Sequence, residues 1–279
     1  MTDLRKITDW DDAYSNGAHI PGGDAYPARW AEQAAAFRAV LAAAGRAELD
    51  LPYGEGERER YDLFRPEGSS KGTVVFVHGG YWMAFDKGRW SHLAAGPLAR
   101  GWAVAMPSYT LCPDTRIAGI TLQMARAVNA IAKAEAGPLR LTGHSAGGHL
   151  VSRLVCADAP LPEEVRARVE HVVSISGLHD LRPLLNTGMN VKLGLDEAEA
   201  VAESPALLRP QPGIGVTCWV GADERPEFVR QTELLANIWL GLGAATGLRL
   251  AEGRHHFDVI DDLADPESAL VSVLLRPLP

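Results

Sequence analysis

Residues 141–150 read LTGHSAGGHL, and this stretch decides the fold that we expect. It holds the pattern G-x-S-x-G, with Ser145 between Gly143 and Gly147. A short apolar strand pattern at 139–142 precedes the pattern, and an apolar helical pattern follows it. An ordinary Gly/Ser-rich turn is the alternative, but between a strand and a helix the motif typically places a serine on a strained turn. That turn lifts the hydroxyl clear of the sheet, at the positive end of the helix. The stretch therefore predicts a nucleophilic serine at 145.

Strands and helices alternate on both sides of this turn. Buried strands are expected at 73–77, 102–106, 139–142, 171–176, 215–221 and about 248–251, and helices at 27–45, 120–131 and 226–243. Such alternation predicts an α/β fold, with a mostly parallel sheet covered by helices on both faces. We expect one domain over 1–279, with an N-terminal helical segment at about 1–45. The proline-rich stretch at about 177–213 is expected to form a small cap-like insertion.

Composition narrows the class of function. The 279 residues carry a net charge of -8 and no block of Lys or Arg, which argues against nucleic acid as a partner. The three cysteines show no C-x-x-C spacing, which argues against a disulfide framework and a thiolate zinc site. The N-terminus is acidic where a signal peptide needs an apolar core, and no run approaches about 18 apolar residues. We therefore expect a cytoplasmic protein that has no membrane partner.

A glycine pair follows the first buried strand. The segment HGGYW at 78–82 places Gly79 and Gly80 where the strand ends. Consecutive glycines let the backbone turn its N–H groups toward one point, which in acyl transfer is the oxygen that gains negative charge. We assign this oxyanion hole to the N–H groups of Gly80, Tyr81 and Ala146, with Gly79 supplying the turn.

The other side chains of this segment have two interpretations each. His78 is expected to brace the loop rather than to move a proton, because it lies behind the hole. Trp82 and Tyr81 are either core aromatics or an aromatic wall of the substrate pocket. Beside a nucleophile, both interpretations stay open.

A serine nucleophile needs a base and a carboxylate that orients the base. In this architecture the histidine follows the last strand, where the sequence reads RHHFD at 254–258. We favour His256 over His255, because it directly precedes Phe257 at the start of an expected helix. A metal site at the paired histidines is the alternative, but no spaced ligand set accompanies them.

The acid is expected in the loop after the strand at 215–221. Asp223 and Glu224 both stand there, and the residues alone do not choose between them. Asp180, which follows an earlier strand, is a third candidate, although an N-cap role at the turn beginning with Leu181 explains it better.

Taken together, these residues resemble the kynurenine formamidase (arylformamidase) group of α/β-hydrolases. The segments that carry the resemblance are HIPGGDAYPARW at 19–30, HGGYW at 78–82, GHSAGGHL at 143–150, SGLHDLRPL at 176–184, DERPEFVRQ at 223–231 and HHFDVI at 255–260. The likeness spans nearly the whole chain, and the H-G-G-x-W pattern is its most specific part.

The resemblance implies an α/β-hydrolase fold and a serine hydrolase that cleaves N-formyl-L-kynurenine to kynurenine and formate in tryptophan breakdown. It implies a catalytic triad and an oxyanion hole, with no metal and no organic cofactor. Members tend to carry the triad acid two residues before a P-E-F tripeptide, which points to Glu224. An aspartate is more usual at that place, so Asp223 stays open.

Two other functions remain as alternatives at this stage. One is a broad carboxylesterase or amidase for small acyl substrates, because the same parts hydrolyse many esters and amides. The other is a non-catalytic ligand receptor built on the same fold. In either case the expected partner is a small-molecule acyl substrate, an aryl formamide or an ester. A homodimer is compatible with the sequence. A free carboxylate on the substrate would need a cation, for which Arg116, Arg182 and Lys192 are candidates.

Overall fold

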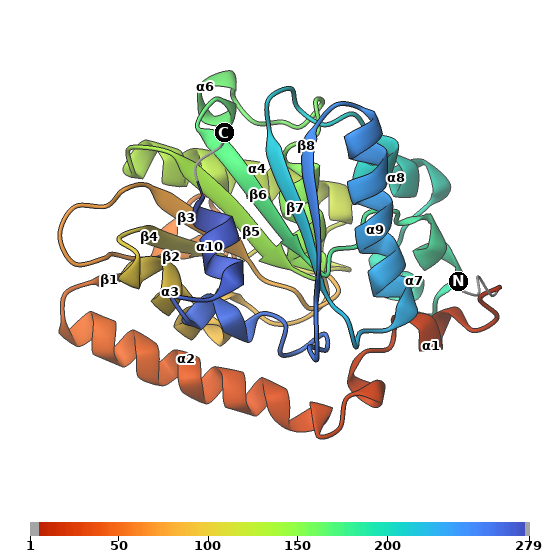
Figure 1. Cartoon of the computed structure of the whole chain (residues 1–279), viewed down its shortest axis with the longest axis horizontal. Helices are drawn as coiled ribbons and strands as arrows, with labels where there is room; N and C mark the ends of the chain where they lie inside the picture. The colour runs from red at the N-terminus through yellow and green to blue at the C-terminus, as the bar shows by residue number, and fades with distance from the viewer. Residues whose placement is uncertain (1–5, 277–279) are drawn as a thin grey trace.

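A single sheet of eight strands runs through the computed structural model, which describes residues 6–276 (Figure 1). The strand order is β1-β2-β4-β3-β5-β6-β7-β8. All neighbours are parallel except the two pairs that involve β2. The strands are β1 Ala47–Pro52, β2 Arg60–Phe64, β3 Thr73–Val77, β4 Ala103–Pro107, β5 Leu139–His144, β6 Val169–Ile175, β7 Gly215–Gly221 and β8 Ala245–Ala251.

Helices cover both faces of the sheet. The longer helices of one face are α4 Ile117–Ala134, α5 Ala146–Arg153 and α9 Pro226–Gly241. The opposite face carries α2 Tyr26–Ala43, α3 Ala95–Ala99 and α10 Ala269–Leu275 (Figure 1). The short helices α1 Trp10–Tyr14, α6 Glu163–Arg166, α7 Asn190–Leu193 and α8 Glu197–Ala202 lie in the connections.

The two faces hold separate hydrophobic cores, because successive side chains of a strand point to opposite sides. On β3, Val75 and Val77 pack toward α4, α5 and α9, whereas Val74 and Phe76 pack toward α2, α3 and α10. Every residue of β3 is buried, as expected for a central strand covered on both faces. This rigid centre fixes the loops at the carboxyl ends of the strands.

Two segments lie near the carboxyl ends of the strands: the N-terminal part and residues 177–213, which follow β6. Residues 177–213, between β6 and β7, carry α7, α8 and short 3-10 turns. Helix α1 lies beside α9 and the first of those turns, near the carboxyl ends of the strands (Figure 1). Among residues 6–276, none of the helices combines the length and the apolar character that a membrane crossing requires.

The sequence-based expectation of the fold class is confirmed, and every strand and helix that we expected is present within a few residues. Strands β1 and β2 were not expected. β1 is half-exposed and carries charges at Glu48 and Asp50, and β2 is interrupted by Asp62, so neither shows the apolar run that marks the central strands. The buried carboxylate of Asp62 forms an ion pair with the Nζ of Lys87 at 2.8 Å.

Candidate active site

Ser145 stands on the sharp turn between β5 and α5. Its backbone has φ +56° and ψ -118°, a conformation that costs a non-glycine residue about 1–3 kcal/mol. The N–H of Ser145 donates to the carbonyl of Ile175 at 2.8 Å, which ties the turn to β6. A side chain on Gly147 would collide with the carbonyl oxygen of Val77, so only glycine permits this close approach of the helix to β3. The strain is therefore held by the two neighbouring strands.

The serine is less open than the motif suggests. We expected its hydroxyl to stand clear of the sheet, but Ser145 is only 2% exposed. The glycine loop after β3 covers it, since a Cβ on Gly79 would lie 3.1 Å from the Ser145 Cβ. The neighbouring Gly80 and Tyr81 are partly exposed and mark the side where the loop reaches solvent.

His256 and Glu224 come together from two different loops. The Nδ1 of His256 donates to the Glu224 Oε2 at 2.6 Å, and both side chains are buried. The other carboxylate oxygen, Oε1, accepts the N–H of Gly221 at 2.8 Å and the hydroxyl of Ser176 at 2.5 Å. Asp223 is exposed, and its backbone N–H donates to the Arg254 carbonyl. The geometry thus pairs the imidazole with Glu224 and leaves Asp223 at the surface.

The ring of His256 is packed on two sides. His144 and Phe228 each lie with their ring centroids 4.5 Å from that of His256. Burial, together with the nearby His256, holds the pKa of His144 well below its usual range, so His144 stays neutral beside the candidate base. Within residues 6–276, the Ser145 hydroxyl and the His256 ring form no direct hydrogen bond. In serine hydrolases without substrate this bond is often long, and it tightens when substrate binds.

The glycine loop has the backbone of an oxyanion site. Gly80 has φ +110°, and the next two residues, Tyr81 and Trp82, also have positive φ of +52° and +57°. In the part of the chain that the structure describes, the N–H groups of Gly80, Tyr81 and Ala146 donate to no protein acceptor. Three backbone donors close to the serine are thus unused by the fold, as a site for a developing oxyanion requires.

The side chains around this loop have different places. His78 is buried and stacks on Tyr109 at 4.3 Å and on Trp90 at 5.9 Å between ring centroids. Its Nδ1 donates to the Gly79 carbonyl at 2.7 Å, and burial lowers its pKa to about 4. This placement suits a neutral brace of the loop.

Trp82 does not form an aromatic wall of the site. It is fully buried and packs edge-on against His149, with ring centroids 5.2 Å apart, so the pocket interpretation is wrong and the core interpretation holds. Tyr81 is partly exposed, and its hydroxyl is bound to the N-terminal segment.

The remaining candidates lie apart from the Glu224–His256 pair. His255 is partly buried and its Nε2 lies 3.1 Å from the hydroxyl of Tyr26. Asp180 accepts two hydrogen bonds from the guanidinium of Arg182, each at 2.9 Å, and one from the Arg182 N–H. Among the described residues, neither side chain forms a hydrogen bond or ion pair with Ser145, Glu224 or His256. Asp180 stabilises the loop after β6, which is close to the cap role that we expected.

The candidate cations for a substrate carboxylate are mostly engaged. Arg182 is occupied by Asp180, and Arg116 pairs with Asp196 at 2.8 Å and with Glu199. Lys192 is exposed on α7. Among the described residues no group of three or more His, Cys, Asp or Glu side chains is placed to hold a metal ion.

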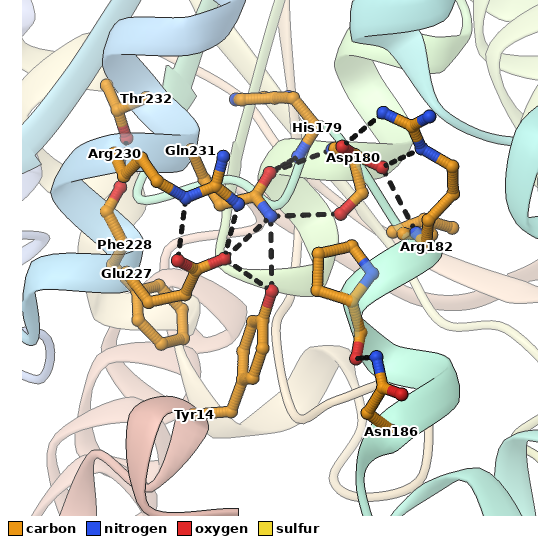
Figure 2. A network of polar contacts seen from close by, with 12 residues as sticks. Tyr14, His179, Asp180, Arg182, Asn186, Glu227, Phe228, Arg230, Gln231 and Thr232 are labelled. Carbon is orange, nitrogen blue, oxygen red and sulfur yellow. Dashed lines mark hydrogen bonds and ion pairs between the residues drawn. The ribbon is translucent and has the colours of Figure 1, made fainter. Parts of the chain in front are cut away.

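Sequence reasoning missed a group of buried side chains that joins α1 to α9. Figure 2 shows Tyr14, Glu227 and Gln231 joined by hydrogen bonds between α1, α9 and the loop at 179–182. The supporting hydroxyl of Ser176 was missed as well. Ser176 lies within the SGLHDLRPL segment, but only the fold brings it to Glu224.

A mostly parallel sheet that presents a serine on a strained strand-to-helix turn, with a carboxylate-paired imidazole from the later loops, is the arrangement of the α/β-hydrolases. The chain is a hydrolase of that class. Residues 61–208 match the model of the BD-FAE family, and the chain belongs to that family.

Relatives extend the similarity over most of the chain. A kynurenine formamidase of Danio rerio is 29% identical over 237 residues, which cover 82% of this chain and 80% of that protein. A kynurenine formamidase of Drosophila melanogaster is 32% identical over 244 residues, covering 81% and 79%. A crystal structure from Silicibacter sp. TM1040, described as a candidate thioesterase, is 54% identical with a TM-score of 0.91, covering 95% of this chain and 98% of that one.

Proposed function

We propose that this hydrolase cleaves the formamide of N-formyl-L-kynurenine, giving kynurenine and formate through a formyl-enzyme. The observation that carries the proposal is the relatedness to kynurenine formamidases over about four fifths of the chain. The site geometry supports it, because Ser145, His256 and the free N–H groups of the glycine loop supply what acyl transfer from an amide needs.

In the first half of the reaction Ser145 attacks the formyl carbon while His256 takes the hydroxyl proton at Nε2. Glu224 holds the Nδ1 proton of the ring and stabilises the imidazolium. The carbonyl oxygen becomes negative in the tetrahedral intermediate, where the N–H groups of Gly80, Tyr81 and Ala146 stabilise it.

In the second half the carbon–nitrogen bond breaks and His256 returns its proton to the leaving nitrogen. An aryl amine is weakly basic and leaves more readily than an alkyl amine, which makes this amide comparable to an activated ester. Water then attacks the formyl-enzyme with His256 as base, releasing formate and restoring Ser145. No step needs a metal or an organic cofactor.

A second candidate is a broad hydrolase for small acyl esters or thioesters. It is favoured by the 54% identity to a protein that is described as a candidate thioesterase. The two candidates share the catalytic parts and differ in the leaving group that the pocket selects.

Turnover separates the two candidates. We expect kcat/KM for N-formyl-L-kynurenine to exceed that for p-nitrophenyl acetate and for a short acyl thioester. If the ester or the thioester exceeds it by orders of magnitude, the formamidase proposal fails and the second candidate stands.

A variant and a probe test whether Ser145 is the nucleophile at all. Ser145→Ala is expected to abolish turnover and to leave the fold intact, as judged by circular dichroism and melting temperature. A fluorophosphonate probe is expected to label the natural chain at Ser145 and not the variant. Failure to label the natural chain, together with an absence of turnover on all substrates, would support a non-catalytic receptor.

A further inference from the structure

The hydroxyl of Tyr81 is held from two directions by the N-terminal segment. It donates to the carbonyl of Tyr14 at 2.5 Å, and the Asn16 Nδ2 donates to it at 3.0 Å. A phenol has one proton, and a carbonyl can only accept, so that proton is committed to Tyr14. Asn16 must therefore be the donor, which fixes the orientation of its amide. We call residues 10–19, which supply both contacts, the N-terminal clamp.

The clamp is itself anchored to α9. The Tyr14 hydroxyl donates to the Glu227 Oε1 at 2.7 Å and accepts from the Gln231 Nε2 at 3.2 Å (Figure 2). The ring of Tyr14 packs edge-on against Phe228, the residue that also contacts His256. Because Tyr14 and Gln231 are buried and both ends of Tyr14 are bonded, its carbonyl is a fixed point relative to the catalytic histidine.

Further contacts join the first 30 residues to the loops of the acid and the base. Asp12 forms an ion pair with Arg225, directly after Glu224. On the other side, the ring of Trp30 packs against Phe257, directly after His256, with centroids 5.3 Å apart. The N-terminal region thus contacts the glycine loop and the two loops that carry Glu224 and His256.

The glycine loop needs such support because its backbone is strained. Tyr81 and Trp82 both have positive φ, a state that persists only when the surroundings fix it. The loop's own bonds, from the N–H groups of Met83 and Ala84 to the Gly80 carbonyl, hold its far end. In the described part of the chain, the hydroxyl end of Tyr81 is held by the clamp alone.

We propose that Tyr14 and Asn16 are positioning residues of the active site, which hold Tyr81 so that its N–H stays directed at the oxyanion. The inference rests on the proposed function for its assignment of the Tyr81 N–H to the oxyanion hole. Such a contact acts on the charge that develops in the transition state and little on ground-state binding, so its loss lowers kcat and leaves KM nearly unchanged.

The test is the variant Tyr81→Phe, which removes both hydrogen bonds and keeps the ring. We expect kcat to fall about tenfold, with KM changed by no more than about twofold. One oxyanion donor contributes roughly a hundredfold to kcat, and a Tyr81 N–H that is less well oriented would lose part of that contribution. Tyr53→Phe is the matched control. It removes a hydroxyl that donates to the Ser108 carbonyl at 2.6 Å outside the site, and it should leave kcat unchanged.

A double-variant cycle distinguishes positioning from general weakening. Asn16→Ala should lower kcat by a smaller factor, and the double variant with Tyr81→Phe should be no slower than Tyr81→Phe alone, since both remove the same contact. The rate of Ser145 labelling by a fluorophosphonate should fall in parallel with kcat. Each factor is a ratio to the natural chain on whichever substrate is turned over, so the test stands even if N-formyl-L-kynurenine is not that substrate.

Three results would overturn the proposal. The first is a folded Tyr81→Phe with unchanged kcat and labelling rate. The second is a loss of kcat in Tyr53→Phe equal to that in Tyr81→Phe. The third is independent, multiplicative effects of Asn16→Ala and Tyr81→Phe. If Tyr81→Phe does not fold, Asn16→Ala decides: a loss of kcat at constant KM supports the proposal, and unchanged kcat refutes it.

Discussion

Replacing Glu224 by glutamine exchanges one carboxylate oxygen for an NH₂ group. The exchange should stop catalysis because it forces His256 into the wrong tautomer. Oε1 of Glu224 accepts two donors, the N–H of Gly221 and the hydroxyl of Ser176. In Glu224→Gln the amide oxygen must take that position, because an NH₂ group cannot accept these bonds. The NH₂ is then placed where Oε2 stands, 2.6 Å from the Nδ1 of His256.

An NH₂ group facing Nδ1 requires this nitrogen to be an acceptor, so the ring proton moves to Nε2. The nitrogen that should take the proton of Ser145 is then already protonated. A carboxylate-to-amide change of this kind in a serine triad lowers kcat about 10⁴-fold, or about 5.5 kcal/mol of transition-state stabilisation. Asp223→Asn is the matched control and should stay within about twofold, since its side chain is exposed.

The assay is steady-state turnover of N-formyl-L-kynurenine and of p-nitrophenyl acetate, with labelling of Ser145 by a fluorophosphonate as a substrate-independent measure. Both variants should melt near the natural chain. The reasoning is refuted if Glu224→Gln keeps more than about a tenth of the activity, or if Asp223→Asn is the variant that loses it.

Further predictions concern the support of the site and the stability of the chain. Ser176→Ala should lower kcat about tenfold at unchanged KM, because the buried carboxylate of Glu224 loses a hydrogen bond worth about 1.5 kcal/mol; an unchanged kcat would show that the bond is dispensable. Gly147→Ala should lower the free energy of unfolding in urea by about 3 kcal/mol, since its Cβ would collide with the Val77 carbonyl, and a variant as stable as the natural chain would contradict this. Burial lowers the pKa of His171 to about 4 in the folded chain. Between about pH 6.5 and pH 4 the unfolded chain therefore binds a proton at His171 that the folded chain does not bind, and the free energy of unfolding decreases as the pH falls through this range. His171→Gln should remove about 2 kcal/mol of the stability difference between pH 8 and pH 5, and an identical pH dependence of the melting temperature would refute the linkage.

Much of the fold was predictable because its signals are local. The central strands are continuous apolar runs, buried on both faces, and the glycine pattern around Ser145 is required by the tight contact of α5 with β3. Strands β1 and β2 were missed, because β1 is half-exposed and charged and β2, although buried, is interrupted by Asp62, so neither has such a signal. The histidine and the residue types of the glycine loop also follow from motifs that are short in sequence.

The sequence by itself determined a parallel α/β sheet, a serine at its strand-to-helix turn and a short set of candidate partners. Only the tertiary structure decided that Glu224 rather than Asp223 meets His256, that Trp82 is core, and that Tyr14 and Asn16 hold Tyr81. The physical reason is that a motif records local backbone requirements, whereas hydrogen bonds between residues more than 30 positions apart depend on how the loops are packed together. Asp223 and Glu224 are adjacent carboxylates that the sequence alone does not distinguish. Burial of Glu224 beside the imidazole of His256 is what distinguishes them chemically.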